Sequence, residues 1–236
     1  LATEGTEAEQ KAAFLALSQL DQPETPRLLT MALDQLAAGK VHVGAQVELL
    51  DVVEKSEHPA VQARWKQLQA QWDTGKDSLA PYRSALGTGN LWRGAWLFQS
   101  HPVFPCIRCH RVNGEGGDAG PDLSMIGAQK SPEYLLESIV HPNAKIAQGF
   151  DVLTIKLEDG SYESGALQSE TAQEIVLKRM DGSEAKIDVS QVVERQAAPS
   201  SMPDIYRDSL SRSELRDLVT YLRALTVAAP AGGDRA

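Results

Sequence analysis

The stretch Cys106-Ile107-Arg108-Cys109-His110 decides how this chain folds. Two cysteines separated by two residues and followed directly by histidine form the attachment pattern of a c-type haem. Two thiols one helical turn apart can add to the two vinyl groups of one porphyrin. The adjacent imidazole then lies under the iron as its proximal ligand. The motif therefore predicts one haem c, attached covalently through Cys106 and Cys109 and ligated by His110.

Two other kinds of site share a pair of cysteines with this spacing. A redox dithiol of the thioredoxin type needs a strand–helix–strand context, whereas a helix is predicted before this pair. A tetrahedral zinc site needs two further ligands, yet the chain has no third cysteine and no local pair of histidines. Haem attachment is therefore the favoured interpretation.

Composition limits the class of protein and its partners. The chain has 236 residues, of which 42% are hydrophobic and 23% charged, as in an ordinary water-soluble protein. A formal net charge of −9 argues against nucleic acid or an anionic membrane surface as a partner. No apolar run is long enough to span a bilayer, and both cysteines belong to the motif, so no disulfide is expected.

The expected location follows from the haem. The chain starts at Leu1 without a signal-peptide pattern, so we expect a processed mature chain or a piece of a longer one. Haem attachment to a CxxCH motif normally takes place outside the cytoplasm. We therefore expect a protein that is periplasmic or otherwise exported.

The first third of the chain has the apolar spacing of helices from residue 7 to 74. Gly39 is expected to end the second helix, and Pro59 to begin the fourth. Four helices in two hairpins are similar to a pair of HEAT-type repeats. The sequence thus predicts a helical domain over residues 1–75.

The haem motif lies in a stretch of short helices and turns. Residues 76–90 contain helix-breaking proline and glycine, and Asn90 can cap a helix that runs from about residue 91 to 98. After the motif, the glycine-rich residues 114–120 allow sharp backbone turns. Ser131 is the expected N-cap of a helix that ends before Pro142.

A small antiparallel sheet is predicted to be inserted at about residues 149–197. Asp159-Gly160 and Asp181-Gly182 are hairpin-turn signals. Apolar residues alternate with polar ones around them, at 153–157, 175–177 and 187–189. This segment has no histidine and no cysteine, so we interpret it as an insertion and not as a catalytic domain.

The clearest helix is the last one. Ser211 and Glu214 form a capping box, and leucines at helical spacing follow from Leu215 to Leu225. Residues 227–236 are small and polar, and we expect them to be disordered.

These features resemble a class I monohaem cytochrome c. In that family the helix before the haem motif crosses the C-terminal helix, and Gly94 and Phe98 against Leu218 and Tyr221 match the residues at the crossing. The resemblance implies a mainly α cytochrome c fold over residues 76–226, with the sheet as an insertion.

The same resemblance implies further haem-binding residues. The family's proline after a glycine-rich loop, whose carbonyl orients the proximal imidazole, corresponds to Pro121 in Gly120-Pro121-Asp122-Leu123. More narrowly, the chain is similar to the planctomycete and verrucomicrobial type of haem-binding domain, which follows HEAT-like helices in membrane-bound dehydrogenase-like proteins. The CxxCH motif, the GPDL stretch with Leu123, and Ser201-Met202-Pro203 support that likeness.

Four methionines are candidates for the sixth ligand of the iron. Met31 lies in the remote helices, Met180 beside a strand turn, and Met125 on the proximal side of the expected fold. Met202 occupies the ligand position of the family and is the predicted ligand, with His141 as the alternative. The remaining histidines have no local companion and are interpreted as incidental: His42, His58 and His101.

The predicted function is one-electron transfer and not enzymatic catalysis. Iron with both axial positions filled cannot readily bind a substrate, and a thioether ligand favours the reduced state. The resemblance implies a dehydrogenase, perhaps of sugars, as the electron donor, on the same polypeptide or in the same complex. A haem sensor or peroxidase-like protein with an open or His-ligated distal site is one alternative. A docking module that presents the helices and the sheet is another.

Overall fold

The computed structural model describes residues 4–20, 22–72, 77–179 and 181–227. Met180 and residues 228–236 of the predicted tail lie outside the described residues. Helices account for 48% of the residues and strands for 16%, which confirms a mainly α chain with one inserted antiparallel sheet. No helix in the described part is long and apolar enough to cross a bilayer.

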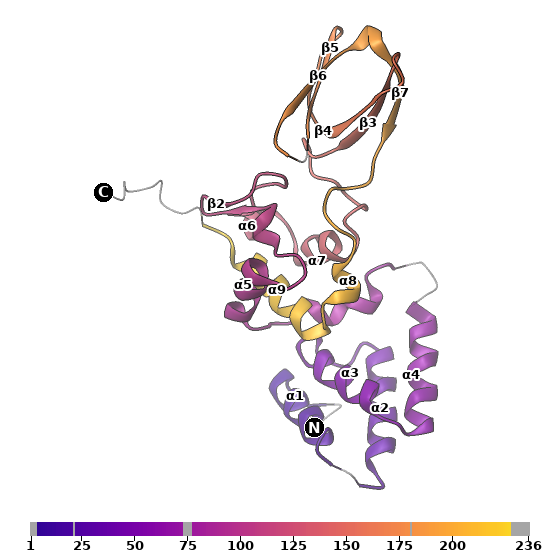
Figure 1. Cartoon of the computed structure of the whole chain (residues 1–236). Coiled ribbons are helices and arrows are strands. Elements are labelled where there is room, and N and C mark those ends of the chain that lie inside the picture. Colours follow the sequence, from indigo (N-terminus) through magenta and orange to yellow (C-terminus); the bar gives the residue numbers. More distant parts are fainter. Residues whose placement is uncertain (1–3, 21, 73–76, 180, 228–236) are drawn as a thin grey trace, which may run out of the picture. The chain divides into compact units, whose positions relative to one another are not determined.

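Contacts between residues divide the chain into two compact units. Figure 1 draws the whole chain. The first unit combines residues 1–95 with 210–224, and the second combines 96–209 with 225–236. The helix before the haem motif is shared between them. The predicted domain limits at residues 75/76 and 226 stay predictions.

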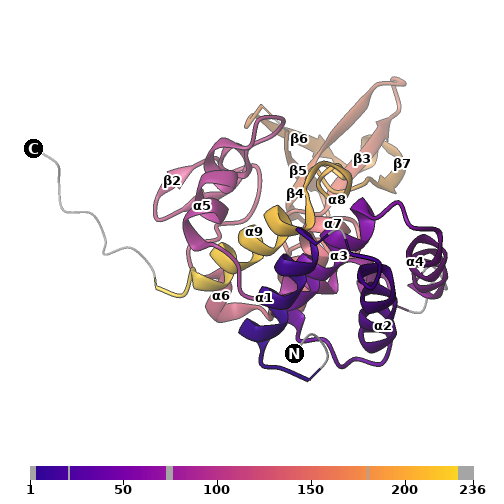
Figure 2. The same cartoon turned by 90° about the horizontal axis from the view of Figure 1, so that it is seen from below.

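Four helices form the N-terminal part of the first unit. The main contacts join alternate helices, α1 with α3 and α2 with α4 (Figures 1 and 2), so the predicted pair of HEAT-type hairpins stays a prediction. Their common core is made by buried apolar side chains such as Phe14, Leu33 and Trp65. The helices are α1 (Glu7–Leu17), α2 (Thr25–Ala37), α3 (Gln46–Lys55) and α4 (Pro59–Trp72), with the 3-10 helix η1 (Val43–Ala45) before α3.

Local sequence signals explain where these helices begin and end. Thr6 and Glu9 form a capping box at the start of α1, with the Thr6 N–H donating to the Glu9 carboxylate over 2.8 Å. Gly39 follows α2 with a φ of +69°, a left-handed conformation in which glycine is favoured. Pro59 begins α4 as predicted.

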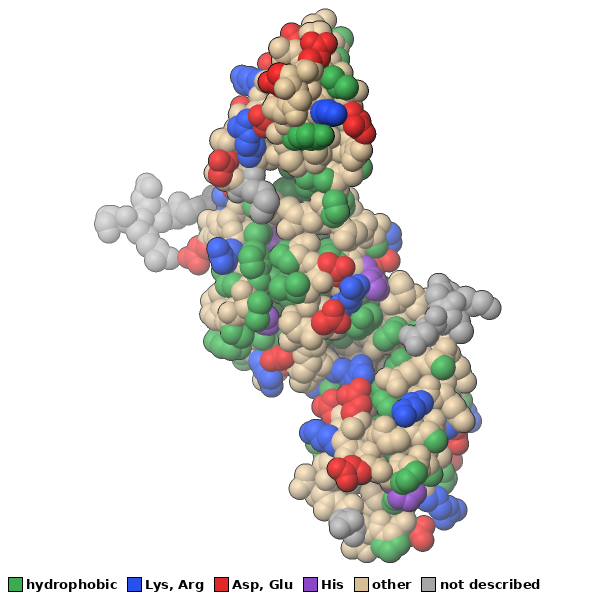
Figure 3. Space-filling model, turned by 45° about the vertical axis from the view of Figure 1, so that its right-hand side comes forward, with side chains coloured by type: hydrophobic (Ala, Val, Ile, Leu, Met, Phe, Trp, Pro, Cys, Tyr) green, Lys and Arg blue, Asp and Glu red, His purple; other side chains and the backbone are tan. Residues whose placement is uncertain are grey.

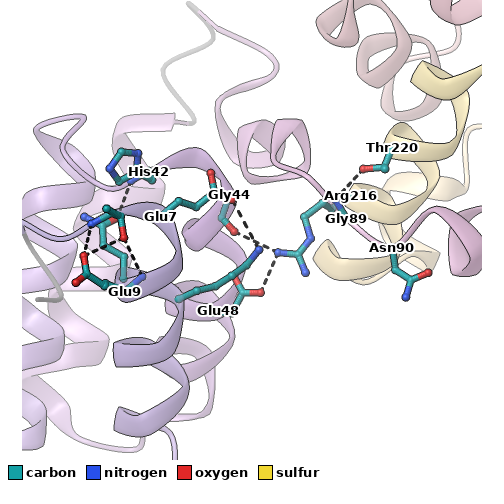
Figure 4. Close-up of polar contacts among 12 residues, drawn as sticks. Glu7, Glu9, His42, Gly44, Glu48, Gly89, Asn90, Arg216 and Thr220 are labelled. Atoms are coloured by element: carbon teal, nitrogen blue, oxygen red, sulfur yellow. Dashed lines mark hydrogen bonds and ion pairs between the residues drawn. The ribbon is translucent and has the colours of Figure 1, made fainter.

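The first unit also contains the last helix, α9 (Arg212–Ala224). Its Arg216 guanidinium lies 2.9 Å from the Glu48 carboxylate of α3 and also donates to the Gly44 carbonyl (Figure 4). One turn earlier, Arg212 forms an ion pair with Glu54. Helix α9 is therefore tied to the N-terminal helices by two ion pairs.

Gly94 allows helix α5 (Leu91–Ser100) to approach α9 closely. A Cβ atom at this position would collide with the Asp217 carbonyl and would lie 2.8 Å from Cβ of Tyr221. The glycine contact with the last helix is thus confirmed. Before α5, the N–H of Gly89 donates to the Thr220 hydroxyl over 2.8 Å, which places the 3-10 helix η2 (Ala80–Leu86) and its following turn beside α9 (Figure 4).

The second unit begins with the haem motif and a set of short elements. The 3-10 helix η3 (Cys106–Arg108) leads into a two-residue hairpin, and Ser131 caps the main helix by accepting from the Tyr134 N–H over 3.2 Å. The elements are β1 (Arg111–Val112), β2 (Glu115–Gly116), α6 (Ile126–Gln129), α7 (Pro132–Val140) and α8 (Tyr206–Ser209).

The inserted sheet has five antiparallel strands in the order β6-β5-β4-β3-β7. They curve around a shared apolar interior (Figure 1), to which Ile155, Leu177 and Ile187 contribute fully buried side chains. The chain enters the sheet after α7 and leaves it before α8. The strands are β3 (Val152–Leu157), β4 (Tyr162–Glu170), β5 (Glu174–Lys178), β6 (Glu184–Asp188) and β7 (Val192–Ala197), with the 3-10 helix η4 (Val189–Gln191) before β7.

Candidate haem-attachment site

A single tight turn carries the two cysteines and the histidine. Pro105 holds an extended backbone just before it, and the N–H groups of Cys109 and His110 both donate to the Cys106 carbonyl, over 3.1 and 2.9 Å. Both cysteines are free thiols and are half-buried. The turn therefore brings two thiols and an imidazole together within five residues, as the motif predicts.

The imidazole of His110 is oriented by the residue that the family pattern indicates. Its Nδ1 lies 2.9 Å from the Pro121 carbonyl oxygen. A carbonyl can only accept, so Nδ1 carries the proton and Nε2 keeps a free lone pair. Burial lowers the pKa of His110, although the bond to Pro121 acts in the opposite direction. The ring is thus held neutral and in the tautomer that can ligate iron.

The glycine-rich loop folds back against the motif. Gly117 donates to the Ile107 carbonyl over 2.9 Å, and Gly120 donates to the Cys109 carbonyl over 2.7 Å. A Cβ atom on Gly120 would lie 2.6 Å from Cε1 and 2.8 Å from Nδ1 of His110. Only glycine fits at that position, because the imidazole ring occupies the space of a side chain.

Leu123, which was predicted as a haem-binding residue, is also held close to the motif by a backbone hydrogen bond. Its N–H donates to the Arg111 carbonyl over 2.8 Å, which places it beside the residue that follows His110. Its side chain is half-buried. Pro121 and Leu123 are therefore both brought to the motif, one through its carbonyl and the other through its backbone N–H.

Burial makes both thiols less acidic. It raises the pKa of Cys106 to about 11 and also raises the pKa of Cys109. Neither cysteine is therefore an activated thiolate of the kind found in reactive dithiols. Among the described residues, no three histidine, cysteine or acidic side chains form a group that could hold a metal ion.

The second unit also exposes apolar side chains. Its Trp96 and Val103 side chains are 55% and 63% exposed, and Ile205 is 36% exposed. Figure 3 shows hydrophobic side chains gathered on the surface beneath the sheet. The two thiols, the oriented imidazole and the close approach of Gly120 fit a covalently attached haem.

The candidate sixth ligands lie in different places. Met202 is half-buried in the segment before α8, where its N–H donates to the Ser200 hydroxyl over 3.2 Å. The Ser200 N–H donates to the Asn143 side chain over 2.7 Å, so this segment starts near the end of α7. His141 is the C-cap of α7, and Met125 precedes α6. Met31 lies on α2 in the first unit and is 44% exposed.

Two residues of the site were not found from the sequence. Tyr206 was not singled out, yet its hydroxyl donates to the Phe104 carbonyl over 2.8 Å. His101 is not incidental, because its Nδ1 accepts a bond from the Phe104 N–H over 3.3 Å. Both side chains are buried. His101 could have been noticed because it lies only five residues before Cys106. Tyr206 gave no such signal, because it lies 102 residues after its partner Phe104.

A comparison with family models places these observations in a family. Residues 93–226, more than half of the chain, match the model described as Cytochrome c. A search of curated proteins gave no match. The matched range contains the CxxCH turn, the oriented imidazole and both helices that meet at Gly94. The chain therefore belongs to the cytochrome c family, whose members carry a covalently bound haem and generally transfer electrons.

Proposed function

We propose that this protein exchanges single electrons through one haem c, with His110 and Met202 as axial ligands of its iron. The hydrogen bond from His110 Nδ1 to the Pro121 carbonyl is the observation that carries the proposal. It leaves the Nε2 lone pair available for an iron, and a carbonyl acceptor raises the basicity of such a ligand. When bound, the haem supplies reversible one-electron exchange between ferric and ferrous iron.

The residues of the chain do two things for that exchange. Cys106 and Cys109 keep the group attached, so it stays in place in both oxidation states. The glycine-rich loop holds the imidazole at one angle, because Gly120 leaves no free space beside the ring. Little structural change is then needed when the charge on the iron changes, which favours fast transfer.

Met202 is proposed as the distal ligand on the basis of its segment. Residues 198–205 contain small residues and prolines and lie between the end of β7 and the start of α8. Pro203 keeps Met202 out of a helix interior. A thioether stabilises ferrous iron relative to a second imidazole and so raises the potential. With both axial positions filled, substrate chemistry at the iron is suppressed.

We further propose an exported location and a dehydrogenase as electron donor, in the same polypeptide or complex. Cytochrome c domains are typically exported, and the sequence of helices before the motif resembles the HEAT-like segment that precedes dehydrogenase-associated haem domains. In this proposal the hairpins and the sheet are surfaces for docking the partner, and the sheet limits which partner reaches the porphyrin edge.

The ligation is tested by visible spectroscopy and carbon monoxide binding. The oxidised wild-type protein should show the weak methionine–iron band near the red end of the spectrum, and its reduced form should bind carbon monoxide poorly. Met202→Ala should abolish the band, lower the potential and admit carbon monoxide. Met125→Ala is the matched control and should change none of these properties.

The opposite results point to the alternatives. If reduced wild-type protein binds carbon monoxide readily, the distal site is open and the sensor or peroxidase-like function is favoured. If Met202→Ala leaves the spectrum unaltered, another residue is the ligand, and His141→Ala then tests the remaining candidate.

A further inference from the structure

The backbone of Phe104 is held on both sides by buried side chains. Its N–H donates to Nδ1 of His101, over 3.3 Å, and its carbonyl accepts from the Tyr206 hydroxyl, over 2.8 Å. The side chains are only 7% and 3% exposed, and their rings meet edge to face with centroids 6.0 Å apart. Phe104 lies two residues before Cys106, so this contact fixes the chain where it enters the haem-attachment turn.

Tyr206 joins two segments that are far apart in sequence. It is the first residue of α8 and follows Met202 by four residues. Its hydroxyl also lies beside the sulfur of Cys106, as a hydrogen-bonding neighbour. Burial keeps the pKa of Tyr206 well above its usual range, so the hydroxyl remains a donor at neutral pH. A single buried side chain therefore connects the segment of Met202 to the segment that attaches the haem.

We propose that Tyr206 is a positioning residue for Met202. Its hydrogen bond to the Phe104 carbonyl holds the segment that contains Met202 in place and so keeps Met202 on the iron. This inference rests on the proposed ligation by Met202. Only Pro203, Asp204 and Ile205 separate Met202 from Tyr206. Proline restricts the backbone of this short connection. A displacement of Met202 large enough to admit another ligand must therefore strain the Tyr206 hydrogen bond. Breaking that bond leaves the Phe104 carbonyl without its partner in a partly buried place, which is unfavourable.

The test is the affinity of the oxidised holoprotein for imidazole, which binds the iron only after methionine has left. Tyr206→Phe removes the hydroxyl and keeps the ring packed on His101. The haem should stay attached, and the apparent imidazole affinity should rise about tenfold, because the opening equilibrium gains roughly the free energy of one hydrogen bond. The methionine–iron band should be retained before imidazole is added.

Two control variants separate this role from a general loss of stability. Tyr162→Phe removes a hydroxyl from a residue that is 64% exposed on the sheet and should leave the imidazole affinity unchanged. Ser131→Ala removes the N-cap bond to the Tyr134 N–H and should lower the free energy of unfolding by a similar amount without changing that affinity.

The possible results show whether positioning by Tyr206 is wrong or whether Met202 is not the iron ligand. If wild type shows the methionine band and Tyr206→Phe binds imidazole no more tightly, Tyr206 does not position the ligand. An equal rise in Ser131→Ala also overturns the inference, because the effect is then one of overall stability. If wild type lacks the band and Met202→Ala binds imidazole like wild type, the proposed ligation itself fails.

A measurement on the wild type covers the case in which Tyr206→Phe does not fold. Hydrogen exchange is followed by mass spectrometry with and without saturating imidazole. The inference predicts faster exchange in the peptide that spans 200–209 and also in the peptide around Phe104. Faster exchange only in the amides before residue 206, with the amides around Phe104 and Tyr206 as protected as without imidazole, contradicts it.

Discussion

His110 uses one ring nitrogen for the protein and leaves the other for the iron. The 2.9 Å contact between Nδ1 and the Pro121 carbonyl sets the tautomer, and Gly120 sets the position of the ring by leaving room for it. These contacts span only 11 residues. The CxxCH motif and the GPDL stretch therefore contain nearly all the information about the proximal side.

Gly120→Ala tests this cradle directly. The added methyl group would lie 2.6 Å from Cε1 of His110, so the imidazole or the loop must move. We expect loss of about 1–3 kcal/mol in the free energy of unfolding and an altered haem spectrum, measured by denaturant titration and absorption.

Gly149→Ala is the control for the glycine prediction. Gly149 has a φ of +82° but no atom within 4 Å of its Cβ position. Its replacement should therefore cost stability through backbone strain alone and leave the spectrum unchanged. If Gly120→Ala also leaves the spectrum unchanged, the ring does not depend on the cradle.

At the scale of helices and strands, local caps were predictable and long-range pairing was not. Ser211 and Glu214 form the expected capping box, with the Ser211 N–H 3.0 Å from the Glu214 carboxylate. The strands β4 and β7 were not recognised individually. Most β7 side chains are exposed, and its pairing with β3 defines it as a strand. Tyr206 was missed for the same reason, since its partner lies 102 residues earlier.

The sheet gives a prediction at this scale. Lys178 of β5 forms a 2.7 Å ion pair with Asp118 of the glycine-rich loop, which links the insertion to the haem segment. Shortening the hairpin turns at 159–160 and 181–182 should change electron-transfer rates with protein partners and leave the ligand spectrum intact. Stopped-flow kinetics with one donor and one acceptor measures this effect.

Lys178→Gln provides a milder version of the same experiment. Both partners of the ion pair are partly exposed, so stability should change by less than about 1 kcal/mol. Rates that stay at the wild-type value in the hairpin variants, for donor and acceptor alike, would rule out a role of the sheet in partner access.

For the whole molecule, helix α9 links the cytochrome sequence to the N-terminal helices. It belongs to the range that matches the family, yet Arg216 and Glu48 are each only 12% exposed in their ion pair. Arg212 also lies over the Trp65 ring, at 5.8 Å from its centroid. Sequence periodicity predicted the helices themselves. It could not predict these contacts, which join residues more than 140 positions apart.

Removal of residues 1–76 tests how far the two parts depend on each other. A chain that begins at Asp77 should keep its haem spectrum, because the described site residues all lie beyond that point. Its free energy of unfolding should fall, because helix α9 loses both of its ion pairs to the N-terminal helices. Glu48→Gln with Glu54→Gln in the full chain should reproduce part of this loss. Loss of the haem spectrum would show that the helices are needed for the site.

A spectroelectrochemical titration tests whether this chain is a one-electron carrier with His110 and Met202 on its iron. We expect one reversible one-electron wave in the wild type and a lower potential in Met202→His, because a second imidazole stabilises ferric iron better than a thioether does. An irreversible wave would rule out a simple electron carrier, and the same potential in Met202→His as in the wild type would rule out Met202 as the ligand.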